Sequence, residues 1–370
     1  MNDPRGSSAP EPASAPGLFR PSYDYAASVI VVSFNTRDLL RECLTSLREE
    51  CARLPEAGVP ADRFLSVGSE GLTAEILVVD NASHDGSADM VAAEFSRPGV
   101  PVRLIRSDVN LGFGAANNRA IEAARGRYVV LLNSDAFLHP GALGRALAHM
   151  DADTSAGIGG ARLVFLDGAW QPSARSFPSI VRDAFLLTGL ASRFPRSRVF
   201  AAAERTWADP LESAEVGWVT GAFMILRREA LARTGLFDPA FFLYYEEVDL
   251  CRRMKAAGFR VLYWPDVVVT HLHGKSSRQV GEQVFSENET QVVLWRMRST
   301  FLYYRRHHGQ KAWLARWLEE CLYTLRFLRN RFSPTPSRRA RAGEAALLLS
   351  LLRRAWRETQ GGRESPPTPW

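Results

Sequence analysis

The chain has 370 residues, of which 46% are hydrophobic, so it can bury a substantial core as one large domain or two ordinary ones. Its four cysteines lie far apart and form no CxxC pair, which argues against a disulfide framework or a zinc site and favours reduced thiols in the cytoplasm. The net charge of +6 is uneven, because residues 291–370 hold 16 Lys and Arg against 5 Asp and Glu, whereas the rest is mildly acidic.

The sequence predicts neither a signal peptide nor a membrane span. Residues 1–27 are rich in Pro, Ala and Ser and contain no continuous apolar stretch, so we predict a disordered leader. The apolar run AALLLSLL at 345–352 is much shorter than the roughly 20 residues that cross a bilayer. We therefore expect a cytoplasmic protein.

Strands and helices alternate over the first part of the chain. The β-branched run SVIVVSF at 28–34 predicts a strand, and the next segment, NTRDLLRECLTSL, has leucines at helical spacing. A turn-rich loop at 53–73 follows. The same pattern then predicts strands at 75–80, 102–107 and 127–133 and helices at 87–95 and 114–124.

Such alternation is typical of a parallel sheet whose strands are buried on both faces by helices. Ligands bind such sheets at the carboxyl ends of the strands. Here those ends read SFN, VVDNAS, SDVNLGFG and LNSD. The sequence therefore predicts a polar site along one edge of the sheet.

The second part of the chain is less regular. We expect strands at 161–165, 215–228, 260–264 and 266–273, a helix at 246–257, and amphipathic helices from about 290 onward. The predicted organisation is a disordered leader (1–27), a core domain (28–285), a basic amphipathic helical region (286–358) and a disordered tail (359–370).

Four segments together resemble glycosyltransferase family 2, closest to its bacterial rhamnosyltransferase-like subgroup. They are SVIVVSFNTRDLLRECLTSL, ILVVDNASHDGSADMV, NLGFGAANNRAIEAARGRYVVLLNSDAFLHPGAL and the stretch from VTGAFMILRR to VVVTHLHGKSS. The resemblance implies an α/β GT-A fold, which is a Rossmann-like, mostly parallel sheet flanked by helices, here with a C-terminal helical extension. It also implies a nucleotide-diphosphate sugar donor, a divalent metal and inversion at the anomeric carbon.

The resemblance assigns the metal site to the segment LLNSDAF. Asp135 stands where the family places the last Asp of its DxD motif, and Asn133 replaces the first. Asp135 is thus expected to ligate Mn²⁺ or Mg²⁺, which stabilises the departing diphosphate, while Asn133 acts through a water or the sugar. Taken alone, Asp135 would fit equally well as a cap for a helix at 140–150.

The donor nucleotide and its sugar are expected along the strand ends. Asp80 resembles the family's nucleotide-binding acid, although Asx turns are a competing interpretation for Asp80 and Asn110. The complete predicted set is Ser33, Asn35, Asp80, Asn110, Gly112, Asn133, Ser134 and Asp135.

The catalytic base is expected in YYEEVDLCRR. Crowded acids at the start of a helix raise one another's pKa, so one of them could accept the proton of the acceptor hydroxyl. By resemblance Glu247 is the first candidate and Asp249 the alternative. In the other interpretation, Glu246 and Asp249 orient the helix through backbone and arginine contacts.

A histidine follows in VVVTHLHGKSS. His271 matches the family's histidine, so we expect it to ligate the metal or to contact the diphosphate. His273 is a competing candidate because it lies on the same face of the predicted strand.

The basic C-terminal helices interleave arginine with aromatic and aliphatic residues. This composition suits an anionic membrane surface on the inner face of the cell membrane, and packing in a homo-oligomer is an equally good alternative. Nucleic acid is not an expected partner, since no recognition fold accompanies the charge. We predict transfer to a surface-glycan saccharide or a polyprenyl-linked acceptor, and the alternative function is a non-catalytic nucleotide-sugar-binding scaffold.

Overall fold

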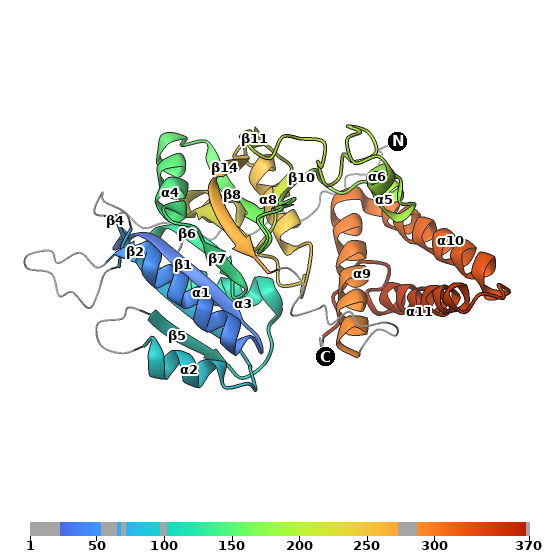
Figure 1. Ribbon diagram of the computed structural model, residues 1–370, viewed down its shortest axis with the longest axis horizontal. Helices are drawn as coiled ribbons and strands as arrows, with labels where there is room; N and C mark the ends of the chain where they lie inside the picture. The colour runs from blue at the N-terminus through green and yellow to red at the C-terminus, as the bar shows by residue number, and fades with distance from the viewer. Residues whose placement is uncertain (1–22, 53–64, 68–71, 97–101, 273–286, 368–370) are drawn as a thin grey trace, which may run out of the picture.

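The computed structural model describes residues 23–52, 65–67, 72–96, 102–272 and 287–367. A sheet covered by helices forms one part of the molecule, and three long C-terminal helices form the other (Figure 1). In the described part of the chain, no helix has the length and apolar character that a membrane crossing requires.

Four parallel strands form the centre of the sheet in the order β5, β4, β1, β6. Their apolar runs are buried from both sides, as Val29, Ile30 and Val31 of the first strand illustrate. This confirms the predicted α/β class. The strands are β1 (Tyr25–Ser33), β4 (Leu72–Asn81), β5 (Val102–Ser107) and β6 (Gly126–Asn133).

Helices cover both faces of this sheet, because their apolar stripes face it. One face carries α1 (Arg37–Glu50), α2 (Ser87–Glu94) and α4 (Ala142–Ala152). The other carries α3 (Gly112–Ala123), α7 (Arg228–Thr234) and α8 (Glu246–Ala256). The helices predicted from periodicity are present within a few residues of their expected bounds.

Beyond β6 the sheet continues through one antiparallel strand, β13 (Phe223–Arg227), into β8 (Ala156–Val164) and β14 (Arg260–His271). β13 pairs with β6 and with β8, and β14 runs parallel to β8. β7 (Ala136–Leu138) pairs with the end of β14. The short strands are β2 (Cys51–Ala52), β3 (Leu65–Val67), β9 (Trp170–Gln171), β10 (Ala174–Arg175), β11 (Ala214–Glu215) and β12 (Trp218–Val219).

Two strand predictions in this half were wrong. The strand expected at 215–228 is divided into β11, β12 and β13. The two strands expected at 260–264 and 266–273 form one long strand, β14, whose register shifts between Trp264 and Val268. Pro265 lies at this shift, and because it has no N–H it cannot donate to the strand ladder.

The C-terminal part is formed by α9 (Glu287–His308), α10 (Ala312–Arg331) and α11 (Pro336–Glu358), with a short 3₁₀ turn η3 (Gly309–Lys311) between the first two. Figure 1 shows the three helices as a triangle, with α5 (Ile180–Leu187) and α6 (Leu190–Arg193) beside α9 and α10. On one side α9 packs against α11, and on another it contacts Val248 of α8 and Phe241, which precedes that helix.

Residues 359–367 differ from the disordered tail that was expected. The Thr359 side chain is fully buried, and its hydroxyl donates to the Ala355 carbonyl. Gly362 has a φ of 82° and lies so close to α9 that a Cβ would approach the Phe301 carbonyl oxygen to 2.2 Å. Packing of glycine against a helix more than 50 residues earlier cannot be read from local composition. The predicted leader of 1–27 is also too long, because β1 begins at Tyr25 and Ala27 is fully buried. The predicted limit at 285 lies outside the described ranges.

Candidate active site

The carboxyl ends of β1, β4 and β6 lie side by side because these strands are in register. Ser33 pairs with Asp80 across β1 and β4, and Val32 pairs with Asn133 across β1 and β6. Thr36 links two of the loops, because its hydroxyl lies 2.9 Å from the Ser33 hydroxyl and donates to Ser134 Oγ at 2.9 Å. The sheet thus brings the predicted donor-site residues of three strands to one edge.

Asp80 and Asn35 differ in how fully their side-chain oxygens are hydrogen-bonded within the protein. Asn35 has a φ of 53°, and its side-chain oxygen accepts the backbone N–H of His84 at 2.8 Å. Asp80 is buried, and only its Oδ2 accepts a hydrogen bond, from the Ser83 N–H at 3.3 Å. Its Oδ1 has no partner among the described residues. A buried oxygen of this kind suits a ligand donor such as a ribose hydroxyl or a base N–H.

Asn110 and Gly112 lie in a turn at the start of α3. Asn110 Oδ1 accepts from Asn81 Nδ2 and from the Gly112 N–H, both at 2.9 Å. Gly112 has a φ of 76°, and a Cβ there would lie 2.1 Å from the Phe242 carbonyl oxygen. The glycine therefore lets the start of α3 approach the loop before α8. Asn81 was missed, although its position directly after Asp80 was a usable signal.

Asp135 and His271 meet where β7 pairs with β14. Both side chains are buried, and His271 Nε2 lies 3.3 Å from Asp135 Oδ1. On the other side of the ring, Nδ1 lies 2.9 Å from Gln171 Oε1. A glutamine carbonyl oxygen only accepts, so this contact places the proton on Nδ1 and turns the Nε2 lone pair toward Asp135. Gln171, from the turn-rich stretch after β8, was not predicted.

This pair fits a divalent ion of the predicted kind. Neighbouring ligands of an octahedral ion with bonds of about 2.1 Å lie about 3 Å apart, close to the observed 3.3 Å. Asn133 Nδ2 lies 3.4 Å from His271 Nε2, so the residue that replaces the first Asp of the motif borders the same place. Groups of three or more His, Cys, Asp or Glu that could hold a metal do not occur among the described residues. An ion here would take its other ligands from the donor diphosphate and water. His273 lies outside the described ranges.

The first turn of α8 carries two acids whose oxygens are not fully engaged. Glu246 is buried and Glu247 is half-buried, and within the described chain Oε2 of each has no hydrogen-bond partner. Burial raises the pKa of both carboxyls, and the charge of Glu247 raises that of Glu246 further. Glu246 also contacts α3, since the Gly114 position faces its side chain. The acidic turn therefore adjoins the strand edge through α3.

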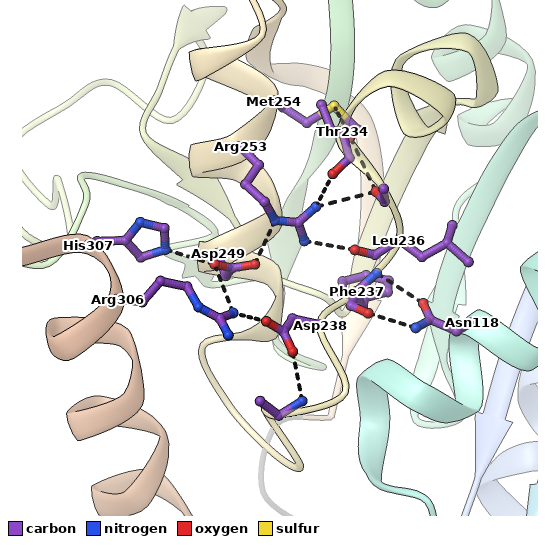
Figure 2. Close-up of polar contacts among 12 residues, drawn as sticks. Asn118, Thr234, Leu236, Phe237, Asp238, Asp249, Arg253, Met254, Arg306 and His307 are labelled. Carbon is purple, nitrogen blue, oxygen red and sulfur yellow. Dashed lines mark hydrogen bonds and ion pairs between the residues drawn. The ribbon is translucent and has the colours of Figure 1, made fainter. Parts of the chain in front are cut away.

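Asp249, in the same first turn of α8, is in a different state. It is fully buried between Arg253 Nε at 2.8 Å and His307 Nε2 at 2.7 Å (Figure 2). Burial alone would raise the pKa of Asp249, but the hydrogen bond from His307 and the contacts with Arg253 hold it below its usual range. With both oxygens occupied, Asp249 is poorly placed to accept a proton from a substrate.

The fold is the GT-A fold of glycosyltransferases, and the comparisons with known proteins agree. The model of the family described as Glycosyl transferase family 2 matches residues 28–234. The chain belongs to this family, and its relatives place it with the rhamnosyltransferase-like members.

Two relatives and one solved structure illustrate the likeness. N-acetylglucosaminyl-diphospho-decaprenol L-rhamnosyltransferase of Mycobacterium tuberculosis is 31% identical over 229 residues, which cover 58% of this chain and 72% of the relative. Rhamnosyltransferase WbbL of Escherichia coli is 26% identical over 208 residues, covering 53% and 70%. The mannosyltransferase PcManGT from Pyrobaculum calidifontis, solved with GDP-Man and Mn²⁺, shares the fold with a TM-score of 0.51 at 18% identity, covering 95% of this chain and 90% of that one.

Proposed function

We propose that this glycosyltransferase moves a sugar, with rhamnose the first candidate, from a nucleotide-diphosphate sugar to a hydroxyl of a lipid-linked or surface-glycan saccharide, with inversion at the anomeric carbon. One observation carries the proposal: the buried Asp135–His271 pair lies at the carboxyl edge of the sheet. The choice of sugar and acceptor draws on the mycobacterial relative, whose name specifies an L-rhamnosyltransferase for a diphospho-decaprenol-linked N-acetylglucosamine.

In this proposal the donor site is organised by the ends of the parallel strands. Asp135 and His271 Nε2 would hold Mn²⁺ or Mg²⁺, which supplies Lewis-acid stabilisation of the leaving diphosphate. Asp80 Oδ1 accepts from the nucleoside. Gln171 keeps the proton of His271 on Nδ1, so that Nε2 stays available as a ligand. Asn133 contributes its amide to the sugar or to a water.

Glu247 is the proposed base. The acceptor hydroxyl oxygen attacks the anomeric carbon, its proton passes to Glu247, and the bond to the diphosphate oxygen breaks so that the nucleoside diphosphate leaves with the electron pair. A single displacement of this kind inverts the anomeric centre. Because burial raises the pKa of Glu247, the acid limb of the rate profile is expected above the value of about 4.3 typical of an exposed glutamate.

We further propose that α10 seats the protein on an anionic membrane on the cytoplasmic side. Trp313, Trp317 and Phe332 are 54%, 58% and 79% exposed, and with Leu325 and Leu328 they fall within about 120° of the helix circumference. The exposed Arg331 falls within this apolar face by helical geometry, and the exposed Arg329 lies beside its edge. Anionic headgroups would neutralise these arginines, whereas a second copy of the chain would oppose like charges.

Vesicle flotation tests the membrane seat. The wild-type protein should float with vesicles that contain anionic lipid, and the Trp313→Gln/Trp317→Gln/Phe332→Ser protein should not. Leu166→Gln/Leu211→Gln is the matched control, because it removes exposed apolar side chains elsewhere. Equal flotation of all three proteins would reject the proposal. A wild-type protein that does not float and instead dimerises in solution through this apolar face would also reject it.

The transferase function is tested by a donor screen. UDP-, GDP- and dTDP-sugars are added with Mn²⁺, and one of them should raise the melting temperature, because a ligand that binds only the native state stabilises it. The same donor should then release its nucleoside diphosphate in the presence of a saccharide acceptor. Binding without any release would favour the non-catalytic scaffold.

A further inference from the structure

The segment between α7 and α8 carries unusual backbone conformations directly before the acidic turn. Tyr244 and Tyr245 have φ values of 68° and 71°, in the left-handed region that bulky residues rarely adopt. Such a conformation persists only where surrounding contacts hold it. Tyr245 is also the residue from which α8 starts, so the two tyrosines set the direction in which Glu246 and Glu247 leave the loop.

The contacts that hold this segment come from one stripe of α9. Trp295 packs on Phe242 with ring centroids 4.6 Å apart. One turn later Ser299 Oγ donates to the Leu243 carbonyl at 2.8 Å, and after another turn the Tyr303 ring lies 5.2 Å from the Tyr245 ring. These α9 residues are four apart and therefore share one face of the helix.

The last turn of α9 continues the stripe and fixes both ends of the segment. His307 Nε2 contacts Asp249 Oδ1 at 2.7 Å, and Arg306 pairs with Asp238 near the start of the segment (Figure 2). Asp238 in turn accepts the Ala240 N–H at 2.8 Å. Asp249 thus connects α9 to the first turn of α8.

We infer that α9 positions the proposed base, with Ser299 and His307 as positioning residues that hold the Tyr244–Tyr245 turn and thereby aim Glu247. The inference rests on the proposed function in treating Glu247 as the base. The C-terminal helices are then part of the catalytic unit, although they lie beyond residues 28–234, which the family model matches. Neither residue touches the substrate in this account.

Full-length Ser299→Ala and His307→Ala proteins test the inference. Arg305→Gln is the matched control, because it lies in the same last turn and its side chain makes no hydrogen bond or ion pair within the described part of the chain. Two readouts are needed: amide hydrogen exchange of residues 241–250, and kcat measured beside the dissociation constant of the donor.

Exchange across 241–250 should accelerate in both variants and not in the control. The kcat should fall about tenfold to a hundredfold while donor affinity stays within about twofold, because misplacement of a catalytic group affects the transition state more than donor binding. His307→Gln, which keeps an N–H donor for Asp249, should recover most of the lost rate.

Unchanged exchange at 241–250 in both variants would overturn the inference. A fall in kcat that is accompanied by a similar fold-loss of donor affinity and by a lower melting temperature would also overturn it, because that pattern indicates general destabilisation. Absence of turnover in the wild-type protein would instead count against the proposed function, and the exchange measurement would still decide whether α9 holds the acidic turn.

Discussion

The carboxyl edge of the sheet, where we propose that the donor binds (the donor edge), and the acidic first turn of α8 are built in different ways. At the donor edge, Ser33, Asp80 and Asn133 are delivered by adjacent parallel strands, and the register of the sheet alone sets their positions. The acidic turn of α8 depends on α9, a helix whose contacts with it span 56 residues for Ser299–Leu243 and 58 for His307–Asp249. One half of the site therefore follows from the sheet, and the other from packing between distant segments.

The largest effect is expected at the donor edge. Asp135→Ala removes the carboxylate of the proposed metal site, so kcat should fall by at least about a thousandfold, since metal stabilisation of a leaving group is worth several kcal/mol. Release of nucleoside diphosphate under saturating donor measures this loss. Asp89→Ala is a suitable control, because this highly exposed acid pairs with Arg106 at the surface. Full activity of Asp135→Ala would refute the metal assignment.

A smaller effect is expected from the residue behind the histidine. Gln171→Leu removes the acceptor for His271 Nδ1, so the ring can rotate or change its tautomer. Loss of such supporting hydrogen bonds typically weakens metal binding about tenfold to a hundredfold. Calorimetric titration of Mn²⁺ in the presence of nucleoside diphosphate should register that change. Unaltered Mn²⁺ affinity would mean that Gln171 does not orient the ligand.

The smallest effect concerns the packing of α9 against α5 and the pH dependence of the stability that this contact contributes. Asp183 of α5 accepts the Tyr304 hydroxyl at 2.5 Å, and burial raises the pKa of Asp183 to about 6. The native state therefore holds this proton more tightly than the unfolded chain, whose aspartate titrates near 4. Its contribution to the free energy of unfolding should fall as pH rises from about 4 to about 6 and stay level above that.

Asp183→Asn removes this titration while it keeps an oxygen acceptor for Tyr304. The melting temperature of the variant relative to wild type should rise between pH 4 and pH 6 and then remain constant. Melting curves over this range provide the measurement. If the difference in melting temperature between the variant and the wild type does not depend on pH, the pKa of Asp183 is not raised in the native state. The contact between α5 and α9 would then be more accessible to water than its burial indicates.

The sequence allowed the strands and helices that carry the polar edge to be predicted, because their signals are local. Apolar runs and helical spacing located β1, β4, β5, β6 and their helices, and the polar residues that follow each strand marked the edge of the sheet. Gln171 could not be found in this way, because its role comes from the pairing of β8 with β9, which carries it toward His271. The hydrogen bond between His307 and Asp249 could not be predicted for the same reason. The composition of α9 indicates a basic amphipathic helix, but it does not indicate which part of the chain that helix packs against.

The most direct test compares wild-type and Glu247→Gln proteins at equal saturation with the donor. Glutamine keeps the size of the side chain but cannot accept the acceptor proton, so the account predicts unchanged donor affinity and loss of nearly all acceptor-dependent release of nucleoside diphosphate. Turnover by Glu247→Gln at the wild-type rate would contradict the account and would mean that a different residue acts as the base.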